Sequence, residues 1–268
     1  MAYIERDYIS PNFIEHEITY AGKYGGKGEK RAEKKKATPL EIKKNNHWNK
    51  VKYYRRLMQL NFYPGDMWTC LKYKAGTRKE IALVKKDLKK FFDRMRSLYK
   101  RRGQKLMYIY RLEIGKRGGL HCHVVLNRIP DCDLLMRDAW KNASEDAGAI
   151  DFQTIDDSGG YGGLSEYLCK EPEEEIQGQM RFLIPEDRKK VYAVNSSRNL
   201  KRPEPVKKEY HHWTLRKILQ GEEIKATEGF YVDKSSIQTG INKFTGMSYL
   251  YYTEVRIKKK ARGEPWTG

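Results

Sequence analysis

The sequence has no apolar run long enough to cross a membrane as a helix, and its first residues, MAYIERDYIS, lack the charged-then-apolar pattern of a signal peptide. We therefore expect a cytoplasmic protein. Cysteine is scarce, and the four cysteines are scattered singly rather than paired as CxxC: Cys70, Cys122, Cys132 and Cys169. This spacing argues against a zinc ribbon and a disulfide framework, and it predicts reduced, mostly buried thiols.

A phosphate-binding loop is also absent. The glycine-rich stretch YGGKGEK looks similar to one, but Lys27 is followed by Gly rather than by Ser or Thr. We therefore expect neither an ATP-driven motor nor a small-molecule cofactor.

Acidic residues are outnumbered, with 35 Asp and Glu against 54 Lys and Arg, for a net charge of +19. A solvated surface is the ordinary explanation of charge, but so large an excess of one sign costs self-repulsion. A polyanionic partner explains the excess better, and nucleic acid is the first candidate. An anionic membrane surface is a weaker one.

The chain length of 268 residues suits one large domain, or one domain with appendages. Residues 1–37 end in a glycine- and lysine-rich stretch and predict a flexible basic arm. Thr38 and Pro39 predict a helix start, and the helix should end before Pro64. We expect the main domain to span 38–205, with this helix leading it, and a C-terminal accessory segment to span 206–268.

The middle of the chain alternates strand and helix patterns in the order β-α-β-β-α-β. Thr77 and Glu80 predict a capping box for the first of these helices, Gly103 its end, and Gly148 the end of the second. A glycine-rich turn, GKRG, joins the two central strands as a hairpin. The order predicts an α+β fold, with a central antiparallel sheet that carries helices on one face.

Period-2 alternation assigns the two faces of that hairpin. The apolar rows should face the helices: Leu106, Tyr108, Tyr110, Leu112 and Ile114 on one strand, and Leu120, Cys122, Val124 and Leu126 on the other. The opposite rows carry Arg111 and Glu113 beside His121 and His123. Since cross-strand neighbours project from the same face, Glu113 and both histidines should converge on the open face of the sheet.

Two imidazoles and one carboxylate on one face form a ligand set for a divalent ion with open coordination positions. The set tolerates manganese or magnesium as well as zinc, so it does not choose the metal. Chance alone can place two of six histidines two positions apart. The carboxylate on the same face, opposite an apolar row, favours the metal site.

A second feature is the stretch GGYGGLSEYLCKEP, at 159–172, in which a short helix should end before Pro172. Tyr167 and Lys170 fall on one helical face, and a neighbouring cation lowers the cost of a nucleophilic phenolate. A core tyrosine beside a solvated lysine is the better explanation of this spacing when it stands alone. Tyr161 is a second tyrosine, on the glycine-rich turn.

In combination, the HCH triplet and the later YLCK helix resemble the HUH endonucleases, and specifically the initiators of rolling-circle replication. The stretches LMQLNFYPGDMWTCLKY, YIYRLEIGKRGGLHCHVVLN and SSRNLKRPEP are similar to segments of replication initiators from small single-stranded DNA phages and plasmids. The resemblance covers roughly residues 50–205, with its motifs in the same order.

The resemblance implies a metal-dependent nickase and strand transferase in a bacterial host cell. His121, His123 and Glu113 would bind manganese or magnesium. Tyr167 would attack the scissile phosphate and form a 5′-phosphotyrosine, while Lys170 stabilises negative charge. Three cations are candidate DNA contacts: Arg111, Lys116 and Arg117. Arg111 could instead pair with Glu113.

The implied partners are single-stranded DNA at a replication origin, as a strand or a hairpin, and a host helicase and polymerase. Two other functions fit the same pattern. A single-tyrosine transposase shares the chemistry but usually carries its tyrosine near the C-terminus. A non-catalytic single-strand binder with an RNA-recognition fold shares the element order, but it stacks bases on exposed sheet aromatics, whereas Tyr108 and Tyr110 are predicted to face the core.

Overall fold

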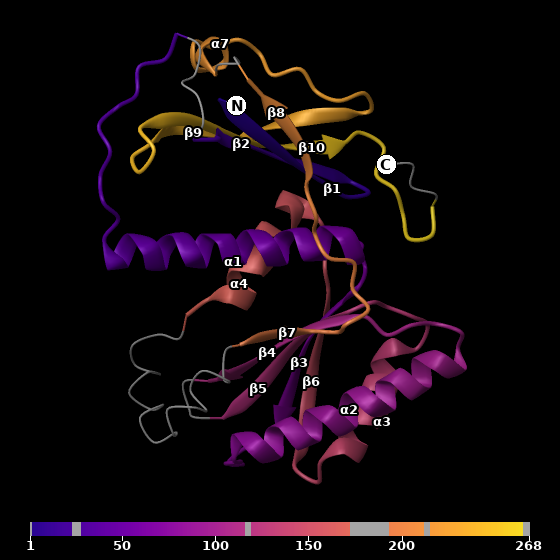
Figure 1. Cartoon of the computed structure of the whole chain (residues 1–268). Coiled ribbons are helices and arrows are strands. Elements are labelled where there is room, and N and C mark those ends of the chain that lie inside the picture. Colours follow the sequence, from indigo (N-terminus) through magenta and orange to yellow (C-terminus); the bar gives the residue numbers. More distant parts are fainter. Residues whose placement is uncertain (1, 23–27, 116–118, 172–192, 212–214, 265–268) are drawn as a thin grey trace. The chain divides into compact units, whose positions relative to one another are not determined.

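The structure, a computed structural model, describes the chain except residues 1, 23–27, 116–118, 172–192, 212–214 and 265–268 (Figure 1). The chain divides into two compact units. Asn61–Lys201 form the central unit, and Met1–Leu60 together with Arg202–Gly268 form the terminal unit. No helix in the described part of the chain is long and apolar enough to cross a membrane.

The central unit contains the predicted β-α-β-β-α-β order. Its elements are β3 (Met67–Tyr73), α2 (Ile81–Arg101), β4 (Tyr108–Ile114), β5 (Leu120–Leu126), α3 (Cys132–Ala143) and β6 (Ala147–Thr154), followed by the 3₁₀ turn η1 (Ser158–Tyr161), α4 (Gly162–Cys169) and β7 (Val194–Ser196). The sheet has the strand order β6-β3-β5-β4-β7, and all its pairs are antiparallel. The α+β prediction is confirmed.

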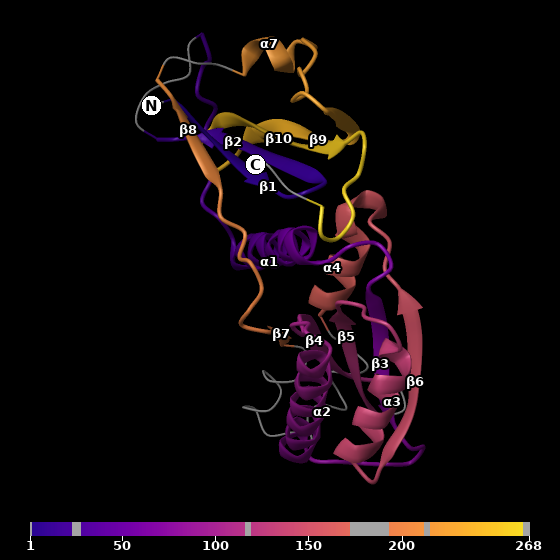
Figure 2. The same cartoon turned by 90° about the vertical axis from the view of Figure 1, so that its right-hand side faces the viewer.

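Helices α2 and α3 cover one face of this sheet (Figure 2). The apolar rows of the hairpin meet them there, since Leu112, Cys122 and Val124 are buried in one core with Phe91 and Trp140. The indole of Trp140 donates a hydrogen bond to the carbonyl oxygen of Lys72 at 2.9 Å, so the core also satisfies its polar group. The face assignment made from alternation is therefore correct.

Two predicted helix ends are confirmed. Helix α1 (Pro39–Asn61) begins with a capping box: the backbone N–H of Thr38 donates to Glu41 Oε2 at 2.9 Å, and the N–H of Glu41 donates to Thr38 Oγ1 at 3.3 Å. Gly103 has a φ of 68° and follows the end of α2, where the left-handed conformation suits glycine.

Two other predicted ends are wrong. Helix α2 begins at Ile81, and Glu80 at its N-cap makes no side-chain capping bond, so Thr77 and Glu80 form no capping box. Gly148 lies inside β6 rather than after a helix. A Cβ on Gly148 would come within 2.6 Å of the backbone of Tyr73, so this glycine permits close strand approach instead.

The terminal unit corrects the predicted arm and appendage. Residues 3–20 form β1 (Tyr3–Ile9) and β2 (Phe13–Tyr20), which pair with β8 (Val206–Tyr210) and β10 (Met247–Arg256), and β9 (Phe230–Asn242) pairs with β10. The antiparallel strand order is β8-β1-β2-β10-β9. Helix α1 and the short α7 (Arg216–Leu219) belong to the same unit. The two ends of the chain therefore build one sheet.

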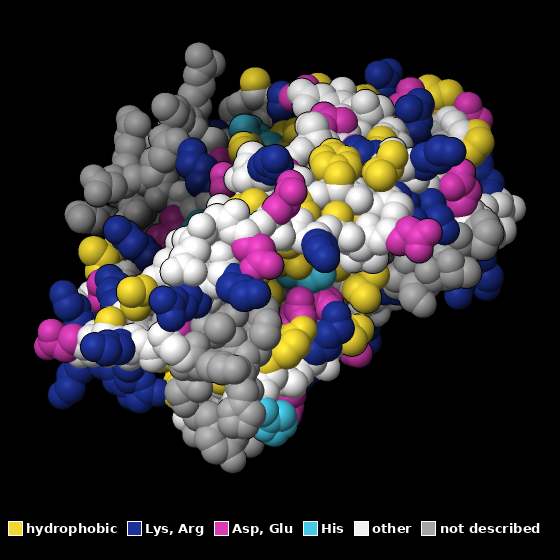
Figure 3. All heavy atoms as spheres, turned by 90° about the horizontal axis from the view of Figure 1, so that it is seen from above, with side chains coloured by type: hydrophobic (Ala, Val, Ile, Leu, Met, Phe, Trp, Pro, Cys, Tyr) yellow, Lys and Arg dark blue, Asp and Glu magenta, His cyan; other side chains and the backbone are white. Residues whose placement is uncertain are grey.

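Charged groups, rather than apolar ones alone, join α1 to this sheet. Glu15 on β2 is 2% exposed, and it accepts hydrogen bonds from Arg55 Nε at 2.6 Å and Arg56 Nε at 2.7 Å. Arg56 also reaches Glu17 at 2.7 Å, and its guanidinium lies 3.5 Å from the ring centre of Tyr8. Part of the positive charge is therefore used inside the fold. Over the face that Figure 3 shows, Lys and Arg side chains are distributed with Asp and Glu among them.

We predict that Arg56→Met destabilises the terminal unit by about 3 kcal/mol, because it leaves the buried Glu15 carboxylate with less compensation. Arg55→Met is the matched control: the Arg55 side chain is 29% exposed, and its loss should cost less than about 1 kcal/mol. Chemical unfolding followed by circular dichroism measures both. Equal losses would contradict the assignment of Arg56 as the principal partner of Glu15.

Candidate active site

The open face of the central sheet gathers polar side chains from three neighbouring strands. Arg111 on β4 pairs with His123 on β5, and His123 pairs with Cys70 on β3. One step along the strands, Glu113 pairs with His121, which in turn pairs with Lys72. Since paired residues in antiparallel strands project from the same face, these six side chains share one surface. The predicted juxtaposition of Glu113 with both histidines follows from this register.

Tyr167 on α4 reaches two of these groups. Its hydroxyl donates to Glu113 Oε2 at 3.1 Å and lies 3.2 Å from His123 Nε2. The same His123 nitrogen is 3.0 Å from Glu113 Oε2, so the three polar atoms form a triangle. Figure 1 shows α4 on the opposite side of the sheet from α2 and α3. The side chain of Tyr167 remains 40% exposed, so the phenol is accessible from solvent.

Trp68 supports the triangle, and sequence reasoning missed it. Its ring stacks on His123 with centroids 5.2 Å apart and an interplanar angle of 14°, and it meets the edge of Tyr167 at 5.6 Å. Alternation along β3 already places Trp68 on the same face as Cys70 and Lys72, so the signal was present. The tryptophan restrains the orientation of both the imidazole and the phenol.

The electrostatics of the triangle oppose ionisation of the tyrosine. Burial and the neighbouring Glu113 carboxylate raise the pKa of Tyr167 to about 12. The hydrogen bond with His123 lowers the pKa of Glu113, which therefore stays ionised and able to accept a proton. A cation bound beside Glu113 would remove part of the negative field that raises the pKa of the phenol.

His121 stands apart from the triangle. Its ring lies against the hairpin turn, where a Cβ on Gly115 would come within 2.8 Å of His121 Cε1. Burial and the neighbouring His123 lower the pKa of His121, which keeps the ring neutral and able to bind a metal. Glu113, His121 and His123 are not among the described clusters whose ligand atoms all lie within 4.8 Å of one another. The pair of His123 and Glu113 is preassembled, and His121 is its neighbour.

Arg111 has a different position from the one expected for a DNA contact. Its side chain is 1% exposed, and its Nη1 donates to the carbonyl oxygens of Tyr167 at 2.7 Å and Leu168 at 2.9 Å. Arg111 therefore ties the end of α4 to the sheet. Lys116 and Arg117, the other two predicted DNA contacts, lie outside the described residues.

Tyr161 and Lys170 flank the nucleophile candidate. Tyr161 is 3% exposed, and its hydroxyl donates to the carbonyl oxygen of Phe62 at 3.1 Å, so its phenol is sequestered in the core. Lys170 directly follows α4 and is exposed, and its backbone N–H donates to the Tyr167 carbonyl at 3.2 Å. Of the two tyrosines, only Tyr167 reaches the polar face.

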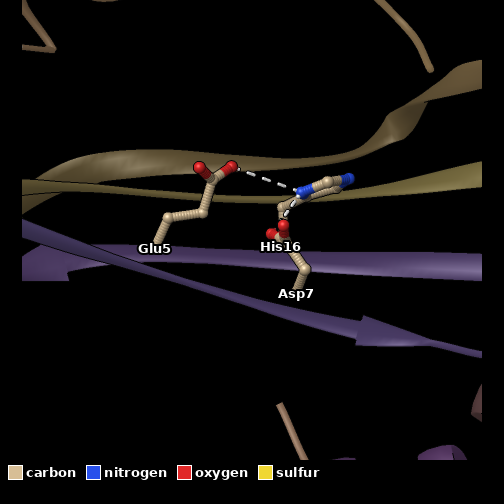
Figure 4. A group of neighbouring side chains, drawn as sticks. All are labelled: Glu5, Asp7 and His16. Carbon is tan, nitrogen blue, oxygen red and sulfur yellow. Dashed lines mark hydrogen bonds and ion pairs between the residues drawn. The ribbon is translucent and has the colours of Figure 1, made fainter. Parts of the chain in front are cut away.

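The described residues contain a metal-ligating cluster that sequence reasoning missed. Glu5 and Asp7 on β1 meet His16 on β2 (Figure 4), and their ligand atoms lie within 4.8 Å of one another. His16 Nδ1 is 2.7 Å from Asp7 Oδ1 and 3.4 Å from Glu5 Oε1. The cluster belongs to the terminal unit and could hold a metal ion.

An imidazolium can satisfy this cluster without a metal. Burial opposes a charge on His16, but its hydrogen bonds to Asp7, Glu254 and Glu5 outweigh that effect and raise its pKa to about 10. Lys208 adds a second cation, 2.8 Å from Asp7 Oδ2. A metal would have to displace the proton that His16 holds.

Comparison with known families bears on the central unit. Residues 66–172 match a family model of replication-associated proteins, the ORF2 type. The matched segment contains Glu113, His123 and Tyr167 and all the elements that position them. The match confirms the resemblance to replication initiators that the sequence motifs indicate. No curated protein and no solved structure matches the chain significantly.

We predict that the stability of the terminal unit falls as pH rises from about 6.5 towards 10 in the presence of a chelator. A histidine whose pKa is raised to about 10 by folding stabilises the fold fully below its unfolded value, and that contribution is lost as pH rises through the folded value. His16→Gln should lower stability at pH 6.5 and flatten the dependence. The exposed His211→Gln should change neither.

Thermal unfolding across this pH range, with and without added manganese or zinc, makes the measurement. A protein that loses stability on chelation at pH 7 and regains it with metal would show that a metal, rather than a proton, occupies the cluster.

Proposed function

We propose that the chain is a metal-dependent, site-specific nickase and strand transferase that initiates rolling-circle replication from single-stranded DNA. The observation that carries the proposal is the exposed phenol of Tyr167 beside Glu113 and His123. These three residues lie within the segment that matches the replication-associated family. A host helicase and polymerase would act on the product.

The donor set on the open face fits a divalent ion. Glu113 Oε2 and His123 Nε2 are 3.0 Å apart, and two cis ligands at about 2.1 Å from one octahedral ion are separated by about 3 Å. His121, neutral and on the same face, would be the third ligand. A carboxylate with imidazoles suits manganese or magnesium. When bound, the ion would polarise the scissile phosphate as a Lewis acid.

The chain's own residues supply the nucleophile and the proton acceptor. The phenol of Tyr167 gives its proton to Glu113 or His123, both within hydrogen-bond distance. Its oxygen then bonds to phosphorus as the bond from phosphorus to the 3′ oxygen breaks. The 3′ oxygen takes up a proton and leaves as a hydroxyl. The product is a 5′-phosphotyrosine, which keeps an ester bond for rejoining, and Lys170 stabilises the phosphate charge.

The packing of two aromatic residues argues against a non-catalytic single-strand binder. Tyr108 and Tyr110 pack against the helix-side core, and Tyr108 stacks on Phe92 with ring centroids 3.9 Å apart. They are therefore directed away from the open face, where an RNA-recognition fold would need them.

We predict that the wild-type protein, incubated with origin-bearing single-stranded DNA and manganese, forms a protein–DNA adduct that resists denaturant. Tyr167→Phe should form none, because it lacks the attacking oxygen. Tyr161→Phe is the matched control and should still form the adduct, because Tyr161 bonds to the Phe62 carbonyl in the core. Denaturing gel electrophoresis with labelled DNA reads the result. An undiminished adduct with Tyr167→Phe would sink the proposal.

We further predict that His123→Ala lowers the nicking rate by at least about 100-fold while DNA binding is largely retained. The substitution removes both a metal ligand and a proton acceptor, but it changes no lysine or arginine. Nicking assays at several manganese concentrations, with binding measured separately by fluorescence anisotropy, separate the two effects. A parallel loss of binding would instead assign the histidine to strand recognition.

A further inference from the structure

A basic cavity lies at the edge of the central sheet, where β4 and β7 meet the end of α2. Its volume is about 850 Å³. Four cationic side chains line it: Arg96, Lys100, Lys105 and Arg198. Among the described residues that line the cavity none is acidic, and the neutral members include Tyr108 and Asn199. The cavity is thus a concentration of positive charge that its own walls do not neutralise.

The usual explanation of such charge does not cover all four cations. Lys100 lies in the last turn of α2, where a cation favours the helix dipole. Arg96 bonds to Asp93 one turn earlier, which offsets part of its charge. Lys105 and Arg198 come from two segments far apart in sequence, and neither lies in a helix. Convergence of like charges costs self-repulsion unless an anion offsets it.

The backbone that carries Arg198 is held in place on both sides. The N–H of Ser197 donates to the Tyr108 carbonyl at 2.9 Å, and the N–H of Tyr108 donates to Ser197 Oγ at 3.1 Å. Asn199 Nδ2 donates to the Leu106 carbonyl at 3.0 Å. The Arg198 side chain is nevertheless exposed. A fixed backbone with an exposed guanidinium is preorganised for an anion, because binding does not have to order the segment.

We propose that this cavity binds the phosphate backbone of a DNA strand that flanks the nicking site. The identity of the strand rests on the proposed function, whereas the phosphate chemistry rests on the cavity itself. Tyr108, in its wall, belongs to the apolar row of β4, and Glu113 belongs to the opposite row. The cavity therefore engages a different part of the DNA from the phosphate at Tyr167. It also gives a role to the SSRNLKRPEP stretch, which the catalytic mechanism does not use.

The test compares two doubly substituted proteins with the same change in charge. Lys105→Gln with Arg198→Gln removes two cations from the cavity. Lys85→Gln with Lys86→Gln, the matched control, removes two exposed cations from the first half of α2, outside the cavity. Binding of an origin-length single strand is measured by fluorescence anisotropy over a series of salt concentrations. Adduct formation is measured on a short oligonucleotide that spans only the nick.

Each phosphate contact on a single strand contributes about 0.7 to the slope of log affinity against log salt concentration. We expect the cavity variant to lose about 1.4 from the slope, since it removes two such contacts, and the control to stay close to wild type. Both should form the short-oligonucleotide adduct at the wild-type rate. Equal slopes for the two variants would overturn the proposal, as would a cavity variant that loses only the binding of inorganic phosphate. If wild type forms no adduct but the slopes still differ, the proposed function fails and the cavity assignment stands.

Discussion

Arg111 sets the distance between the tyrosine helix and the sheet. Helix α4 has eight residues, too few to be stable alone, and its last carbonyls have no partners within the helix. The buried guanidinium satisfies them by donating to the carbonyls of Tyr167 and Leu168. Because Arg111 and Glu113 are two residues apart on one strand, the same strand that holds the proton acceptor also holds the backbone of the nucleophile. The triangle of Tyr167, Glu113 and His123 depends on this connection.

Much of the central unit was predictable because its information is local. Alternation along β4 and β5 correctly separated the core row of Cys122 from the polar row of His123, and helix periodicity correctly located α2. The role of Arg111 was not predictable, because its partners are backbone carbonyls, which every sequence possesses. Nor was the position of the His121 ring, which depends on side-chain rotation against Gly115. Period-2 patterns assign a face, but they do not assign a partner.

The terminal unit shows the opposite case. Strand β1 pairs with β8, about two hundred residues later in the chain, so no short-range signal announces the pairing. Its charged residues also mislead, since Glu15 and Arg56 look like a solvated surface in the sequence and are buried together in the structure. Charge counted from composition therefore overstates what is available to a nucleic acid. The cations of the cavity at Arg198 differ because its described walls supply no carboxylate.

The register of the β4–β5 hairpin has a consequence for how this chain can evolve. His121 and His123 share a face with Glu113 only because a single residue separates the histidines along β5. A single-residue insertion between them would send one histidine into the core and bring Cys122 or a neighbour to the surface. Substitutions within the strand alter the site one group at a time, whereas a change of length there inverts it. Variation in length is thus confined to the turns, and lineages of this fold should diversify their loops while conserving the parity of their strands.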